Sequence, residues 1–198
     1  SMLKPNAASL FEKESFDTDA VAANVVYKSS HEKINLGKRL FYDTQLSKNN
    51  DRSCATCHQP EKAFTDGLKV ATDLVGSPLL RNTPSLNYAG FYHGQFWDMR
   101  QSDIESLTTN VIENKNEMHG DMVTILNLVK KDTVYAKYFR NVFNTENIET
   151  RHIQNALAVY VRSLSTFSSK FDMYMQGNSK ALTKQEQHGF NLFIGKAK

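Results

Sequence analysis

The chain has 198 residues, with 24 Lys and Arg against 21 Asp and Glu, which gives a net charge of +3 at neutral pH. So balanced a charge excludes a dedicated nucleic-acid binder or membrane-surface protein. A hydrophobic fraction of 40%, with 12 Phe and 8 Tyr, excludes general disorder. No apolar run approaches the roughly 20 residues of a membrane span, and no signal peptide is found in this sequence.

Hydrophobic periodicity predicts an all-α fold. A first helix is expected over residues 31–42, followed by a polar, turn-rich approach over 43–53. Residues 54–96 hold Pro60, Pro78 and Pro84 together with several glycines, which predicts a long, ordered loop region of functional importance. The remaining helices are expected from Asp103 to about Glu113, over 122–131, over 135–143, from about Ile148 or Glu149 to Leu164, and after the capping box Thr183–Glu186.

The sequence holds two cysteines, and both lie in the motif Cys54-Ala-Thr-Cys57-His58. Two thiols at this spacing can form thioethers with the two vinyl groups of a haem, and the adjacent His can ligate the iron. A thioredoxin-type pair would open a helix in a βαβ unit, which the pattern lacks, and a structural zinc site would need further ligands. The motif therefore predicts covalently attached haem c.

The sixth iron ligand is left open by the sequence. A haem that only transfers electrons usually has a second axial ligand, whereas one that activates a small molecule keeps that position free. The residues downstream that could ligate are Met99, Met118, His93 and His119. Each has a simpler interpretation, because methionine often fills cores and a lone histidine is more often a surface or hydrogen-bonded residue.

Five segments in order resemble the bacterial di-haem cytochrome c peroxidases, a group that also includes the enzyme maturing tryptophan tryptophylquinone. They are LGKRLFYDTQLS (36–47), CATCHQPEKAFTDG (54–67), RNTPSLNYAGFYHGQFWDMR (81–100), EMHGD (117–121) and ALTKQEQHGFNLFIGKAK (181–198). The resemblance implies a cytochrome c-like peroxidatic haem domain with long ordered loops and extra helices at 31–177. A lead segment at 1–30 would precede it, and 178–198 would be a linker and the first helix of a truncated second haem domain.

The resemblance also implies roles for individual residues. Cys54 and Cys57 would bind haem covalently, with His58 as the proximal iron ligand. Glu117 would be the distal acid/base and Trp97 the aromatic residue between two haems. Asn82 would be a ligand of an inter-domain calcium ion.

Outside that context a lone Trp97 would be expected in the core. Its neighbours Asp98 and Arg100 could pair with each other or hold a haem propionate, since the planar guanidinium suits carboxylates.

Three positions depart from the family pattern. Many members have a His that caps the resting iron, but residues 59–80 contain none, and Leu74 falls near that place. This implies an iron site that is open without reductive activation. Leu107 and Val111 stand where the family usually has Gln and Pro, which removes a polar side chain from the distal pocket.

The function implied is reduction of hydrogen peroxide to water with electrons from a small donor protein, either a cytochrome c or a cupredoxin. Haem attachment requires export, so a periplasmic location is expected, and the resemblance allows a homodimer. Two alternatives remain: an electron-transfer cytochrome with a Met sixth ligand, and a related di-haem enzyme that oxidises a partner protein. A chain made without haem maturation would be apo.

Overall fold

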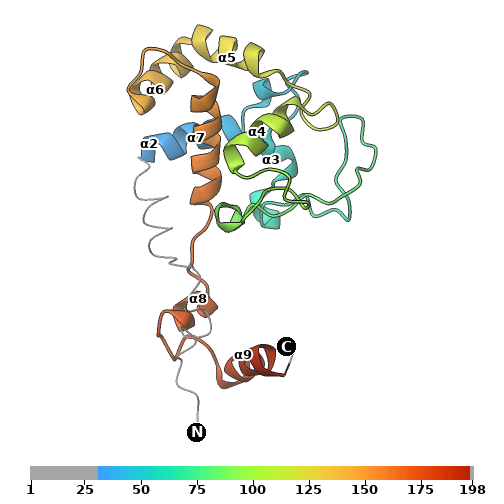
Figure 1. Ribbon diagram of the computed structural model, residues 1–198, viewed down its shortest axis with the longest axis vertical. Helices are drawn as coiled ribbons and strands as arrows, with labels where there is room; N and C mark the ends of the chain where they lie inside the picture. The colour runs from blue at the N-terminus through green and yellow to red at the C-terminus, as the bar shows by residue number, and fades with distance from the viewer. Residues whose placement is uncertain (1–30, 197–198) are drawn as a thin grey trace. The chain divides into compact units, whose positions relative to one another are not determined.

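The computed structural model describes residues 31–196, so the lead segment expected at 1–30 lies outside the described residues. This part of the chain is helical, and its only strand-like features are isolated bridges, which confirms the all-α class. The helices are α2 (His31–Phe41), α3 (Cys54–Cys57), α4 (Ile104–Glu113), α5 (Met122–Lys131), α6 (Thr133–Phe143), α7 (Thr150–Ser163), α8 (Lys170–Met175) and α9 (Lys184–Gly195) (Figure 1). Short 3-10 turns lie at Thr44–Leu46, Pro60–Lys62 and Ala89–Phe91.

The described residues fall into two compact units, one over 31–165 and one from 166 onwards. This division comes before α8, earlier in the chain than the boundary expected at 178–182. The assignment of 31–177 to a haem domain and of 178–198 to a second one stays a prediction.

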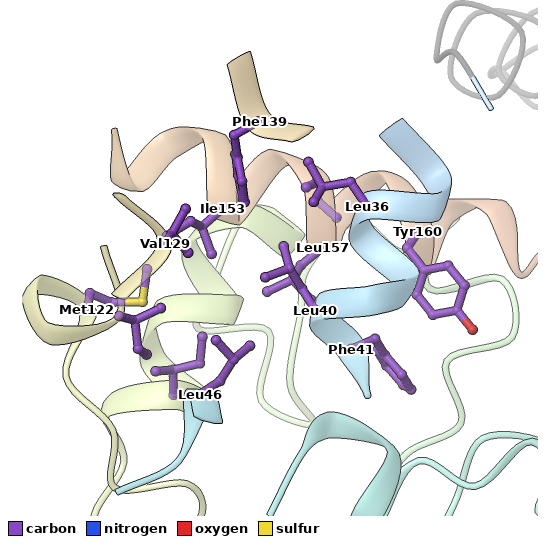
Figure 2. Close-up of a cluster of buried hydrophobic side chains, with 14 of the residues drawn as sticks. Leu36, Leu40, Phe41, Leu46, Met122, Val129, Phe139, Ile153, Leu157 and Tyr160 are labelled. Carbon is purple, nitrogen blue, oxygen red and sulfur yellow. The ribbon is translucent and has the colours of Figure 1, made fainter. Parts of the chain in front are cut away.

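The first unit is built around the crossing of α2 and α7. Leu36 and Leu40 on α2 are fully buried, as is Ile153 on α7 (Figure 2). The two backbones approach closely at Gly37, where an added Cβ would lie 2.0 Å from the carbonyl oxygen of Ala156. Any larger residue at position 37 would therefore push the two helices apart.

Helix α4 is held against α7 by polar contacts. Arg162 forms a bidentate pair with Glu105, with N–O distances of 2.6 and 2.7 Å. The amide of Gln154 donates to Thr109 Oγ1 at 2.8 Å. These bonds set the direction of α4, whose end leads into the segment that contains Glu117.

Several helices begin just after an aspartate whose side chain caps the first turn. Asp103 Oδ1 accepts from the backbone N–H of Ser106, and Asp121 Oδ2 from that of Thr124, each at 2.7 Å. Asp132 ends α5 and also begins α6 by accepting from the N–H of Val134 at 2.8 Å. Because caps of this kind satisfy the free N–H groups of the first turn, they define helix boundaries that can be found in the sequence.

The second unit consists of α8, α9 and the turn between them. The ring of Phe190 packs edge-on against Phe171 at 5.1 Å between centroids. Thr183 and Glu186 exchange capping-box bonds of 2.7 and 3.2 Å, as the sequence predicts. Of the apolar face of α9, Leu192 is 40% exposed and Phe193 is 73% exposed. Across the described residues of both units, we find no helix that meets the length and hydropathy of a membrane span.

Candidate haem-attachment site

The Cys-x-x-Cys-His motif forms a single helical turn. The backbone N–H of Ser53 donates to Thr56 Oγ1 at 3.0 Å, and the N–H of His58 donates to the Cys54 carbonyl at 2.9 Å. Helical spacing of three and four residues places the thiols and the imidazole on one side of the turn. Both thiols are partly buried and free.

A hydrogen bond orients the ring of His58. Nδ1 lies 2.9 Å from the carbonyl oxygen of Phe64. Because a carbonyl only accepts, Nδ1 carries the hydrogen and the lone pair is on Nε2. The backbone of Ala63 and Phe64 is left-handed, with φ of 54° and 58°, and this turn aims the Phe64 carbonyl at the ring. A buried metal-binding histidine commonly has its second nitrogen held in this way.

The local environment keeps His58 neutral. Burial lowers the pKa of the His58 imidazole, while hydrogen bonding to the Phe64 and Pro84 carbonyls and the charge of Asp66 act in the opposite direction. The buried Asp66 carboxylate accepts from Thr83 Oγ1 at 2.8 Å and from the N–H of Leu68 at 2.9 Å. A neutral imidazole is the form that binds a metal ion.

The two thiols do not resemble a reactive redox pair. Burial raises the pKa of Cys54 to about 12 and also raises the pKa of Cys57. Redox-active Cys-x-x-Cys pairs have lowered pKa values instead. Two protonated thiols and a neutral, oriented imidazole fit covalent haem c, with Cys54 and Cys57 for the thioethers and His58 Nε2 for the iron.

Glu117 lies close to this turn, although it is distant in sequence. Its charge raises the pKa of the Cys57 thiol, as does that of Asp66, whereas Arg52 lowers it. Burial raises the pKa of Glu117 itself, while Arg100 and a hydrogen bond from Asn114 act in the opposite direction. Glu117 is therefore a partly buried carboxyl whose charge acts on the attachment turn.

Asn114 fixes the position of Glu117. Its Nδ2 donates to Glu117 Oε1 at 2.8 Å, and its carbonyl accepts from the N–H groups of Glu117 and His119 at 3.0 and 2.9 Å. Leu107 and Val111 precede Asn114 at intervals of about one helical turn, so they lie along the same side of α4. A cleft of about 340 Å³ borders this place, lined by Arg100, Thr109, Asn110, Glu113 and Asn114.

Trp97 is not a core residue, because its side chain is 57% exposed. Its indole Nε1 donates to the backbone carbonyl of Asn82 at 3.0 Å, so the two residues predicted to lie between domains are in contact. Asp98 pairs with Arg100 at 2.9 Å and with Arg81 at 3.2 Å, which confirms the local pairing considered from the sequence. The Arg100 guanidinium also stacks on the Phe96 ring.

The candidate sixth ligands lie in different surroundings. Met118 is buried in the hydrophobic core, and Met99 is 67% exposed. Among residues 31–196, no group of three or more His, Cys, Asp and Glu side chains could hold a metal ion.

Several residues of the site were missed in the sequence. Asn114 had a usable signal, because Asn-x-x-Glu after a helix can form a side-chain bond across a turn. No sequence signal could have predicted the contact of the Phe64 carbonyl with His58 or the effect of the Arg100 charge on Glu117. Both depend on the path of the loops, which brings together residues that are apart in the sequence.

This geometry makes the Cys-x-x-Cys-His turn of an all-helical protein the candidate site for haem c attachment. Residues 31–180 match the family of di-haem cytochrome c peroxidases, and the chain belongs to this family, as the resemblance predicted. Membership implies haem c as the cofactor.

The chain is 36% identical over 167 residues to the methylamine utilization protein MauG of Methylorubrum extorquens, covering 84% of this chain and 47% of that protein. It is 31% identical over 160 residues to the cytochrome c551 peroxidase of Nitrosomonas europaea, covering 81% and 48%. The chain thus spans about half the length of these relatives.

Solved structures agree in fold. A MauG-like protein associated with microbial copper homeostasis superposes with a TM-score of 0.75 at 34% identity, over 84% of this chain and 50% of that one. The di-haem peroxidase BthA from Burkholderia thailandensis gives a TM-score of 0.70 at 24% identity, over 86% and 48%. The second likeness concerns the fold alone.

Proposed function

We propose that Cys54 and Cys57 attach one haem c, that His58 is its axial ligand, and that the whole protein reduces hydrogen peroxide to water. The observation that carries this proposal is the bond from His58 Nδ1 to the Phe64 carbonyl, which orients the ring and puts the lone pair on Nε2. When bound, the haem supplies an iron that exchanges electrons with peroxide. The overall reaction consumes two electrons and two protons for each peroxide and yields two water molecules.

The role of Glu117 in this proposal is to move a proton. Reduction of peroxide to water requires a proton to move from one peroxide oxygen to the other before the O–O bond breaks. Asn114 holds Glu117 Oε1, which leaves Oε2 to take this proton and return it to the other oxygen. Burial raises the pKa of Glu117, which favours this exchange because the carboxylate then takes up a proton more readily than an ordinary glutamate does.

The cleft beside Asn114 is the proposed entry for peroxide and water. Its lining is polar or charged, and it borders the residue that orients Glu117. Leu107 and Val111 would leave the inner wall apolar, without the Gln that the family usually has there.

Electron supply belongs to the proposal for the whole protein. A small redox protein, either a cytochrome c or a cupredoxin, would donate to a second haem, and Trp97 would lie on the route to the peroxidatic haem. Asn82, whose carbonyl holds the indole of Trp97, would keep that ring in place beside a calcium site. We place the protein in the periplasm, because thioether formation follows export.

The test is rapid mixing of the haem-loaded chain with hydrogen peroxide, followed by optical spectroscopy. We expect a fast, saturating change of the haem spectrum and consumption of peroxide. A low-spin, Met-ligated spectrum that peroxide leaves unchanged would contradict the proposal and support an electron-transfer cytochrome.

A second candidate is oxidation of a partner protein by the same haem. The exposed Trp97 and the apolar Leu107 and Val111 favour it, because an exposed aromatic ring offers a route for electrons to leave a bound protein. Product analysis by mass spectrometry after peroxide treatment with a candidate partner distinguishes the two functions.

A further inference from the structure

A connected group of aromatic rings leads from the His58 turn to the protein surface. Phe64, whose carbonyl holds His58, has its ring 6.5 Å from that of Phe41 between centroids. Phe41 in turn contacts Tyr160 at 5.1 Å and Tyr42 at 5.4 Å. Figure 2 shows Phe41 at the end of α2 beside Tyr160 of α7. Each step is an edge contact between rings.

Exposure increases from Phe41 outwards. Phe41 is 1% exposed, Tyr160 is 6% exposed and Tyr42 is 43% exposed. The rings of Tyr160 and Tyr42 both contact the ring of Phe41. The group therefore ends in two phenols beside the same ring, one buried and one in contact with water.

The chemistry of the rings changes at this pair. A Phe ring has no dissociable proton, so it can only bridge an electron transfer, whereas a phenol can release an electron and a proton together. Tyr42 can release its proton to solvent, and Tyr160 lies against the same Phe41 ring that Tyr42 contacts. Both requirements for oxidation of tyrosine are thus met at one place.

We propose that Tyr42 and Tyr160 act as a reducing pair that supplies electrons when peroxide reacts in the absence of a donor protein. This inference rests on the proposed peroxide chemistry. Each phenol gives one electron and one proton and becomes a phenoxyl radical. The two phenols together provide the two electrons and two protons that convert one hydrogen peroxide into two water molecules. Tyr42, at the surface, is the site where the oxidation becomes a lasting modification.

The experiment treats the haem-loaded chain with one equivalent of hydrogen peroxide and no donor, in the presence of a nitroso spin trap. Radicals are detected by electron paramagnetic resonance, and trapped adducts are located by peptide mass mapping. Tyr92 is the internal control: it is 52% exposed, but its hydroxyl donates to the Asn87 carbonyl. The variants are Tyr42→Phe, Tyr160→Phe, the double variant and Tyr92→Phe.

We expect the adduct mainly on Tyr42, loss of the tyrosyl signal in the double variant, and an unchanged signal in Tyr92→Phe. Equal labelling of Tyr42 and Tyr92, or a signal that persists in the double variant, would overturn the pair while leaving the peroxide reaction intact. A haem spectrum that does not respond to peroxide would overturn the proposed function and the pair together. If the double variant fails to fold, the ratio of Tyr42 to Tyr92 adducts in the unmodified chain tests the proposal. An excess of Tyr42 adducts supports it, and equal amounts contradict it.

Discussion

The helical frame, which we define as α2 and α4 to α7, differs from the attachment segment, residues 44–101, in what holds it together. The frame is closed by apolar side chains from α2, α5, α6 and α7. In the described part of the chain, the buried polar side chains all belong to the attachment segment: Ser47, Ser53, Asp66, Thr83 and Gln95.

The backbone shows the same difference. Left-handed residues occur repeatedly in the attachment segment, at Asn50, Ala63, Phe64, Tyr88, Phe96 and Met99. Each costs energy relative to ordinary backbone and has to be held by bonds nearby. The comparison teaches that the frame is held mainly by hydrophobic burial, whereas the attachment segment depends on specific polar contacts.

The largest expected effect is in the attachment segment. Replacing His58 by Ala removes the nitrogen that the Phe64 carbonyl orients, so we expect loss of the His-ligated optical spectrum and of the peroxide reaction. Added imidazole should restore part of both. His152→Ala is the control, because His152 accepts the Glu149 N–H at the start of α7, in the frame. An unchanged spectrum in His58→Ala would show that another residue binds the iron.

Glu117→Gln should slow the peroxide reaction by about 10²–10⁴-fold, since the amide cannot carry the proton. As a base Glu117 must be deprotonated, so the rate should fall as the pH falls through its pKa. Burial raises that pKa, and the fall should therefore begin at a higher pH than for an ordinary carboxyl. Stopped-flow rates across pH provide the measurement, with Glu146→Gln, at a surface carboxyl paired with Arg140, as the control. A variant with an unchanged rate and pH profile would remove Glu117 from the mechanism.

In the frame, Gly37→Ala should lower the free energy of unfolding by about 1–3 kcal/mol, because the new methyl group meets the Ala156 carbonyl. Gly189→Ala, on α9 with open space around it, should instead stabilise its helix by up to about 1 kcal/mol. Urea unfolding followed by circular dichroism measures both. Equal midpoints for Gly37→Ala and the unmodified chain would mean that α2 and α7 do not cross this closely.

The smallest effect is expected at a helix cap. Asp132→Ala should cost about 1 kcal/mol, because the N–H groups of Val134 and Tyr135 lose their acceptor. Asp132→Asn keeps an acceptor oxygen and should cost much less. The same urea experiment measures the free energy of unfolding of both variants. If the two variants lose similar amounts of stability, the cap is not what stabilises α6.

The frame could be predicted from the sequence because its signals are local. Asp103 and Asp121 mark helix starts by bonds that span only three residues. The spacing of apolar residues then identifies the buried face of each helix. Helix α8 was not predicted, since its six residues are too few for a periodic pattern.

The attachment segment could be predicted only in part. The motif identifies Cys54, Cys57 and His58 directly, because covalent haem needs those residue types at that spacing. The contact between Trp97 and Asn82 and the charge of Glu117 near Cys57 join residues from distant turns of loop. No local pattern encodes such contacts, which depend on the whole path of the segment.

The central claim is that one haem is bound covalently by Cys54 and Cys57. The most direct test is the intact mass of the chain produced with a haem maturation system. We predict the mass of the polypeptide plus one haem, and the bare polypeptide mass for the variant with Cys54→Ser and Cys57→Ser. An unmodified mass for the matured parent chain, or a haem increment that persists in the double variant, would contradict the account.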